Sequence, residues 1–276
     1  MGKINTQTID QLLERAKFRE SIELLPKGES FKDQSTICII PIPGPKESKS
    51  FLNCKKCKTK NEYTSSTFSG LHPVFVDAYY KRLMKPMNVP FLEMLIIGYE
   101  VGDAYTKAIE QILVNPQLAD FKYILTVEYD NIVPYLPNTL GPLQLLYKDM
   151  DKGFDVVGGL YWTKGSPSLP LLYGDPKEKR GAPAGYFKVR NDWKPDELVE
   201  CNGMGMGFTL FKMDIFKDKR IKKPWFRSVS EHTVKGPAQY TQDLYFFEKI
   251  RNLNYRVAVD TRIKVGHMDL HTGVIY

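Results

Sequence analysis

The chain has 276 residues, and its 39 lysines and arginines against 32 aspartates and glutamates give a net charge of +7. A hydrophobic fraction of 42% is that of an ordinary globular protein and excludes a wholly disordered or collagen-like chain. The sequence has no run of about 18 apolar residues and no apolar core of a secretory signal. We therefore expect no membrane span and a cytoplasmic location, in the host cytoplasm if the source is viral.

The basic residues bear on whether the protein binds nucleic acid, and the cysteines bear on the redox state of its compartment. Lysines and arginines are spread over the whole length rather than gathered in a dense stripe, so binding of nucleic acid is not expected. Four cysteines are too few for a disulfide scaffold in a chain of this length, and they fit a reducing compartment. Cys54 and Cys57 form a C-x-x-C pair, which is either half of a metal clip or a pair of exposed loop thiols.

The hydrophobic pattern predicts strands that alternate with helices. An amphipathic helix at 8–25 belongs to an expected extension over residues 1–30, and the main domain is expected over residues 31–276. Strands are predicted at 36–42, 94–97, 121–127, 156–161, 207–211 and 256–260, and helices at 73–84, 101–114 and 243–253. Asp103 is expected to open the helix at 101–114. Alternation of this kind predicts a doubly wound, mostly parallel α/β sheet, with ligands beyond the carboxyl ends of its strands.

A pair of carboxylates follows the third predicted strand. Residues two apart on an extended chain point the same way, so Glu128 and Asp130 are expected to lie together at the strand tip. Two clustered carboxylates repel each other unless a cation or protons neutralise them, and hard oxygen ligands suit Mg²⁺ or Mn²⁺. The pattern indicates a metal-diphosphate site, and the alternative is a solvated turn in which Asp130 caps the next segment.

Further motifs follow this pair in a fixed order. They are E-Y-D-N at 128–131, D-V-V-G-G-L-Y-W at 155–162, C-N-G-M-G-M-G-F-T-L-F at 201–211, T-Q-D-L-Y-F-F at 241–247 and V-G-H at 265–267. In order and spacing, the series resembles the glycosyltransferases of the GT-A fold over residues 36–270, in particular the compact phage and bacterial members. The resemblance implies a GT-A-like, Rossmann-like sheet flanked by helices, and E-Y-D is then a variant of the family's D-x-D motif.

The resemblance also implies roles for individual residues. Asp130 would bind a divalent metal that bridges the phosphates of a nucleotide-sugar donor, and Glu128 would contact the donor ribose or a water on the metal. His267 matches the family's late histidine, a second protein ligand of the metal, with His271 as the fallback ligand. Asp243 matches the family's general base, which deprotonates the acceptor hydroxyl, although an aspartate at this place also suits a helix N-cap.

The donor pocket is expected around the tip of the first strand. By resemblance the nucleotide base lies over Pro41, Ile42 and Pro43, and Asp103 lies near the diphosphate or the donor sugar. Gly205 allows the close backbone approach that a sugar or a phosphate needs, or it marks a bend in a strand. The large aromatic residues Tyr161, Trp162 and Trp225 either stack on sugar rings or belong to the core.

The predicted activity is the transfer of a sugar from a nucleoside diphosphate sugar to a carbohydrate or other hydroxyl acceptor, with Mn²⁺ or Mg²⁺ as cofactor and inversion at the anomeric carbon. One alternative is a nucleotidyltransferase of related fold, which attacks phosphorus instead of carbon. The other alternative is a non-catalytic protein that binds carbohydrate or nucleotide on the same fold.

Overall fold

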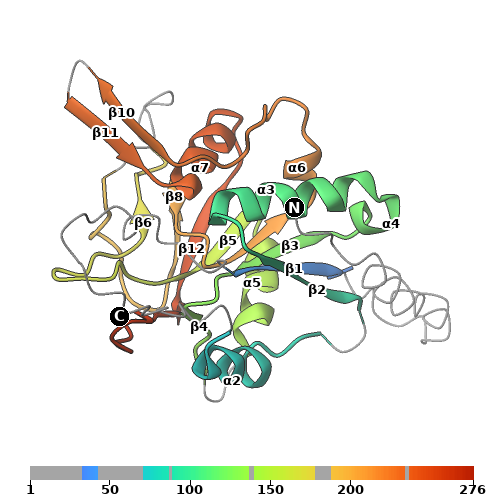
Figure 1. The fold of residues 1–276 in the computed structure, drawn as a ribbon, viewed down its shortest axis with the longest axis horizontal. Helices are drawn as coiled ribbons and strands as arrows, with labels where there is room; N and C mark the ends of the chain where they lie inside the picture. The colour runs from blue at the N-terminus through green and yellow to red at the C-terminus, as the bar shows by residue number, and fades with distance from the viewer. Residues whose placement is uncertain (1–32, 43–70, 87–88, 137–139, 178–187, 234–235) are drawn as a thin grey trace, which may run out of the picture.

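The computed structural model describes residues 33–42, 71–86, 89–136, 140–177, 188–233 and 236–276. Its centre is a seven-stranded sheet with the strand order β2-β1-β3-β9-β5-β12-β7 (Figure 1). These strands are β1 (Thr36–Ile42), β2 (Phe91–Ile97), β3 (Tyr123–Val127), β5 (Val156–Leu160), β7 (Leu198–Cys201), β9 (Phe208–Lys212) and β12 (Val257–Lys264).

The strand directions make this sheet mostly parallel. β1 pairs in parallel with β2 and β3, and β5 pairs in parallel with β12. β9 runs antiparallel between β3 and β5, and β7 runs antiparallel to β12 at the edge. The predicted class, a mostly parallel sheet flanked by helices, is therefore confirmed. Because β9 is reversed, the segment that enters it lies at the same edge as the carboxyl ends of β3 and β5.

Helices cover both faces of the sheet (Figure 1). One face carries α3 (Val101–Val114), α4 (Pro116–Ala119), α6 (Asp214–Lys217) and α7 (Gln242–Asn252), and the other carries α2 (Pro73–Arg82) and α5 (Pro142–Met150). Successive side chains of a strand point to opposite faces, and β1 follows this rule. Ile37 and Ile39 pack with α3, whereas Cys38 and Ile40 pack with α2 and α5.

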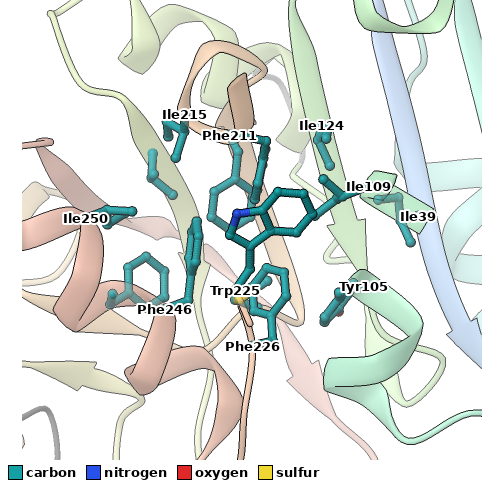
Figure 2. Packing of buried hydrophobic residues seen from close by; sticks show 14 of the residues in the cluster. Ile39, Tyr105, Ile109, Ile124, Phe211, Ile215, Trp225, Phe226, Phe246 and Ile250 are labelled. Carbon is teal, nitrogen blue, oxygen red and sulfur yellow. The ribbon is translucent and has the colours of Figure 1, made fainter. Parts of the chain in front are cut away.

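The face under α3, α6 and α7 holds an aromatic cluster (Figure 2). Phe226 packs against Phe246 with ring centroids 4.8 Å apart, and Tyr105 packs against Phe226 at 5.6 Å. Trp225 is 3% exposed and belongs to this core, so it is not available to stack on a sugar. Through these contacts the cluster joins the start of α3 to α7, and both helix N-termini are thereby fixed relative to the sheet.

Most predicted elements are present, with shifted ends. The strand at 36–42 and the helix at 101–114 have the predicted bounds, but the N-cap of α3 is Glu100 and not Asp103. α7 begins one residue before the predicted start and is capped by Thr241, so Asp243 lies inside the first turn and is not the N-cap. The stretch at 165–193, for which no strand or helix was predicted, contains β6 (Leu172–Tyr173), which pairs with β8 (Gly203–Met204).

Three helices, one edge strand and short pairs of strands were not predicted from the sequence. They are α4, α5, α6, β7, the hairpin of β10 (Val229–Thr233) and β11 (Gly236–Tyr240), and the pair of β4 (Asn131–Ile132) with β13 (Gly266–His267). The predicted N-terminal helix at 8–25, Cys54 and Cys57 lie outside the described residues. The β4 and β13 pair matters most here, because it joins two of the motifs.

Candidate active site

The motif residues converge at the carboxyl edge of the parallel strands. Glu128 and Asp130 follow β3, Tyr161 to Lys164 follow β5, and His267 follows β12. Gly205 and Gly207 precede the reversed strand β9, and Asp243 lies in the first turn of α7. This edge is where parallel α/β sheets bind their ligands.

The antiparallel pair of β4 and β13 brings the E-Y-D-N and V-G-H motifs together. His267 lies opposite Asn131 in the register, and the Met268 amide donates to the Asp130 carbonyl oxygen at 2.8 Å. A tight turn precedes β4, because the Asn131 amide donates to the Glu128 carbonyl oxygen at 3.0 Å. Backbone hydrogen bonds therefore set the distance between the carboxylate and the imidazole.

Asp130 is the centre of the site. Asp130 is 8% exposed, and its Oδ1 is buried without a hydrogen-bond partner among the described residues. Its Oδ2 lies 2.5 Å from Lys164 Nζ and 3.7 Å from His267 Nε2. Burial raises the pKa of this carboxyl, but the contacts with His267 and Lys164 outweigh burial and the net pKa is lowered. Asp130 is therefore a carboxylate at neutral pH.

His267 is held in a defined orientation by its other nitrogen. Nδ1 lies 2.7 Å from the carbonyl oxygen of Trp162, and the ring packs edge-on against Tyr161 with centroids 5.3 Å apart. In the neutral ring, a bond from Nδ1–H to that carbonyl leaves the lone pair that a metal ligand needs on Nε2, which faces Asp130. His271 lies in an exposed turn, where its amide donates to Asp269, and this placement favours His267 over His271 as the site histidine.

Lys164 is a site residue that the sequence analysis did not single out. It follows β5 in a loop rich in glycine and proline, and no motif marks it. Its side chain is 31% exposed, and its ammonium group contacts the 11%-exposed side chain of Asp130. The sequence signal for it is its position three residues past the predicted strand end at 161, on the same sheet edge as the acidic pair.

Glu128 has a different environment from Asp130. The hydroxyl of Tyr105, on α3, donates to Glu128 Oε1 at 3.2 Å. Burial raises the pKa of Glu128 to about 8, and the charges of Asp130 and Asp243 act in the same direction. At neutral pH this carboxyl therefore holds a proton in the absence of added cations, and it can donate a hydrogen bond as well as accept one.

Asp243 is 9% exposed and lies close enough to raise the pKa of Glu128 by its charge. Its Oδ1 accepts hydrogen bonds from the Thr241 hydroxyl and, at 2.8 Å, from the Leu244 amide. Burial raises the pKa of Asp243 and outweighs the effect of these bonds. A carboxylate with a raised pKa is a stronger base, which suits proton abstraction.

The glycines before β9 allow close packing. A Cβ on Gly205 would lie 2.1 Å from the Tyr161 hydroxyl oxygen, and a Cβ on Gly207 would lie 2.1 Å from Asn131 Oδ1. The Tyr161 hydroxyl accepts a hydrogen bond from the Gly207 amide at 2.8 Å, and Tyr161 is a core residue. Packing thus accounts for the glycine at position 205, and its predicted role in donor binding stays a prediction.

The other predicted donor-binding residues lie around the same edge. Pro41 and Ile42 are buried at the carboxyl end of β1, and Pro43 lies outside the described residues. Asp103 is exposed in the first turn of α3, two residues before Tyr105. Trp162 is only partly buried and adjoins the site through its carbonyl oxygen. The backbone amide of Asp103 donates to Glu100 Oε2 at 3.3 Å, and the predicted role of Asp103 near the donor stays a prediction.

The fit of a divalent cation rests on the donor set of Asp130 and His267. Within the described ranges, no group of three or more His, Cys, Asp and Glu side chains is arranged to hold a metal ion. A carboxylate whose Oδ2 faces an oriented imidazole, and whose buried Oδ1 has no hydrogen-bond partner among the described residues, nevertheless matches the ligands that Mn²⁺ takes. The remaining positions would be filled by water and by the phosphates of a ligand, as is usual for such cations.

Comparison with known proteins gives likenesses of backbone alone. No protein-family model and no curated protein sequence matches the chain. A197 from STIV is similar over 85% of this chain and 86% of its own, at 18% identity and a TM-score of 0.49. GalNAc-T7 with UDP, GalNAc and Mn²⁺ is similar over 87% of this chain but 44% of its own, at 11% identity and a TM-score of 0.47. A UDP-glucose pyrophosphorylase complexed with UDP-glucose has 9% identity and a TM-score of 0.41, over 84% of this chain and 91% of its own.

These likenesses do not assign an activity, which has to be argued from the site. None of the helices in the described residues combines the length and the apolar character needed to cross a membrane.

Proposed function

We propose that the chain is a metal-dependent glycosyltransferase of the GT-A type, which transfers a sugar from a nucleoside diphosphate sugar to an acceptor hydroxyl with inversion. The observation that carries this proposal is the position of Asp130, a buried carboxylate between His267 and Lys164 at the ligand-binding edge of the sheet. Sequence motifs far apart in the chain supply Asp130 and His267, and β4 and β13 pair these motifs directly.

In this proposal Asp130 and His267 hold Mn²⁺ or Mg²⁺, and Lys164 adds a positive charge beside them. A divalent cation bound there supplies charge neutralisation for the departing diphosphate. The nucleotide of the donor lies against Pro41 and Ile42, with Asp103 near the donor, and Glu128 hydrogen-bonds the donor. Tyr105 fixes the orientation of Glu128 through its hydroxyl.

Asp243 acts as the general base. The acceptor oxygen forms a bond to the anomeric carbon while the bond from that carbon to the diphosphate oxygen breaks. The acceptor proton passes to the carboxylate of Asp243, which Thr241 and Leu244 hold in place through Oδ1. Attack on the face opposite the leaving group inverts the anomeric configuration.

The first test is thermal stability with UDP, GDP, CDP and ADP, each with and without Mn²⁺, because a ligand that binds only the native state raises its melting temperature. We expect a Mn²⁺-dependent rise with one nucleotide, and loss of that rise in Asp130→Ala. Asp214→Ala, an exposed aspartate at the opposite edge of the sheet, is the matched control. A rise as large in Asp130→Ala as in the wild type would show that Asp130 does not hold the metal.

Product analysis then separates the proposed activity from that of a nucleotidyltransferase. With the corresponding nucleotide sugar, a glycosyltransferase releases the nucleoside diphosphate. With added pyrophosphate, a nucleotidyltransferase instead forms a nucleoside triphosphate and a sugar 1-phosphate. Binding without either product would indicate a non-catalytic binding protein.

A further inference from the structure

The contact between Lys164 and Asp130 occupies the same atom that a metal site needs. Lys164 Nζ lies 2.5 Å from Asp130 Oδ2, and His267 Nε2 faces that same oxygen from 3.7 Å. Asp130 Oδ1 is buried and has no partner in the described part of the chain. Because His267 Nε2 faces Oδ2 and not Oδ1, a cation held by both side chains lies at Oδ2 and competes there with the ammonium group.

The loop of Lys164 has a fixed backbone. The Thr163 amide donates to the Leu169 carbonyl oxygen at 2.8 Å, and the Leu169 amide donates to the Thr163 hydroxyl oxygen at 3.0 Å. The Ser168 hydroxyl donates to the Thr163 carbonyl oxygen at 2.6 Å. Lys164 thus projects from a short turn closed by its own hydrogen bonds, while its four-carbon stem lets the ammonium group change partners.

We propose that Lys164 is an exchangeable counter-ion of Asp130. Its ammonium group neutralises the carboxylate before a divalent cation binds, and it passes to the phosphates of the nucleotide when the cation takes its place. This inference rests on the proposed function, because it concerns the same metal and donor site. Phosphate oxygens that bind the same cation as Asp130 would lie within reach of the Lys164 side chain after it leaves Asp130.

The exchange couples the binding of the metal to the binding of the nucleotide. When the metal binds without a nucleotide, it displaces Lys164 and leaves the ammonium group without an anionic partner. The affinity of the protein for the metal alone is therefore reduced. Metal together with a nucleoside diphosphate restores an anionic partner to Lys164, so the affinity rises. By linkage, the metal increases the affinity for the nucleotide by the same factor.

The test compares Lys164→Met with Lys212→Met. Lys212 contacts Asp155 at 2.9 Å at the opposite edge of the sheet and has a similarly exposed side chain, so its replacement removes the same charge away from the site. Binding of Mn²⁺ is measured by the electron paramagnetic resonance of the free ion, for each protein alone and with UDP, GDP, CDP or ADP. The thermal unfolding of each variant confirms that it is folded.

We expect Lys164→Met to bind Mn²⁺ alone about tenfold more tightly than the wild type does. The nucleotide also increases the Mn²⁺ affinity of the wild type, and we expect this increase to be about tenfold smaller in Lys164→Met. Lys212→Met should match the wild type in both measurements. Equal Mn²⁺ affinities in Lys164→Met and the wild type, or an unchanged effect of the nucleotide, would overturn the exchange and leave the metal site in place. If no protein binds Mn²⁺ with any nucleotide, the proposed metal site itself fails, and the exchange fails with it.

Discussion

Three polar atoms of two adjacent residues are buried without hydrogen-bond partners in the described structure, namely Asp130 Oδ1, Asn131 Oδ1 and Asn131 Nδ2. An unsatisfied buried polar group costs about 1–3 kcal/mol, so such groups are rare in a protein interior. These atoms lie beside His267 and Lys164, at the proposed metal site, and functional sites are where natural proteins commonly carry such costs in stability. The Asn131 side chain also requires a glycine at position 207, because it fills the space that a Cβ there would take.

Replacement of Gly207 by alanine should destabilise the protein. The new Cβ would lie 2.1 Å from Asn131 Oδ1, and Asn131 is fully buried, so the amide group must move out of its site. Overpacking of this kind costs about 1–3 kcal/mol. Urea unfolding of Gly207→Ala measures the loss.

The double variant Gly207→Ala with Asn131→Ala separates this clash from other effects. The three atoms nearest to the new Cβ all belong to the Asn131 side chain, so removal of that side chain creates the room that the added methyl group needs. We expect the double variant to be more stable than Gly207→Ala alone. Purely additive losses would show that the strain arises elsewhere.

Replacement of Asp243 by asparagine should abolish transfer but stabilise the fold above acidic pH. Burial raises the pKa of Asp243, so the native state holds its proton more tightly than the unfolded chain does. Wild-type stability therefore falls as the pH rises through the interval between the unfolded and the native pKa. Asparagine has no charge to bury, and its Oδ1 can still accept the bonds from Thr241 and Leu244.

The expected gain for Asp243→Asn is about 1 kcal/mol at pH 8, and it should disappear at about pH 3, where the wild-type carboxyl is protonated in both states. Melting temperatures of both proteins across this range give the comparison, and the exposed Asp214→Asn serves as control. A variant that is less stable than the wild type at pH 8 would contradict the argument, and unchanged turnover would remove Asp243 as the base.

At the scale of single elements, the start of α3 links local helix formation to the site. Glu100 Oε2 accepts hydrogen bonds from the amides of Gly102, at 2.8 Å, and Asp103, at 3.3 Å. The same first turns carry Tyr105, whose hydroxyl donates to Glu128. Glu100→Ala removes the cap, and it should cost about 1 kcal/mol in urea unfolding.

Glu110→Ala is the matched control for that variant, because it makes the same substitution in the same helix. Glu110 pairs with Lys223 on the surface, where both side chains are about half exposed, so its loss should cost less than about 0.5 kcal/mol. Equal losses in both variants would mean that Glu100 does not act as a cap.

The elements that could be predicted from the sequence are those with a strong local pattern. The apolar run of β1 and the periodic helix α3 were predicted with their bounds, whereas Asp130 and His267 were assigned to one site by the resemblance to the GT-A family. The two-residue strands β4 and β13 have no local pattern, because their pairing depends on contacts between residues far apart in the sequence. Lys164 was missed for the same reason, since only the folded sheet brings it to Asp130.

At the scale of the whole molecule, one sheet separates two apolar layers. Cys201 is buried in the layer of α3, α6 and α7, and Cys38 is buried in the layer of α2 and α5. The same strands supply alternate side chains to both layers, so neither layer can lose its strands without exposing the other. We therefore expect the two layers to unfold together.

The two thiols can report on this cooperativity, because each marks one layer. Burial raises the pKa of Cys38 and of Cys201 to about 12, so both are protonated as well as shielded at pH 8. Alkylation by iodoacetamide then requires unfolding, and peptide mass spectrometry after a brief pulse measures each thiol separately across a urea series. Cys54→Ser and Cys57→Ser remove the other two thiols of the chain. The two labelling curves should share one midpoint. A lower urea midpoint for Cys201 than for Cys38 would instead show that the layer of α3, α6 and α7 opens before the rest of the sheet, together with the edge strand β7.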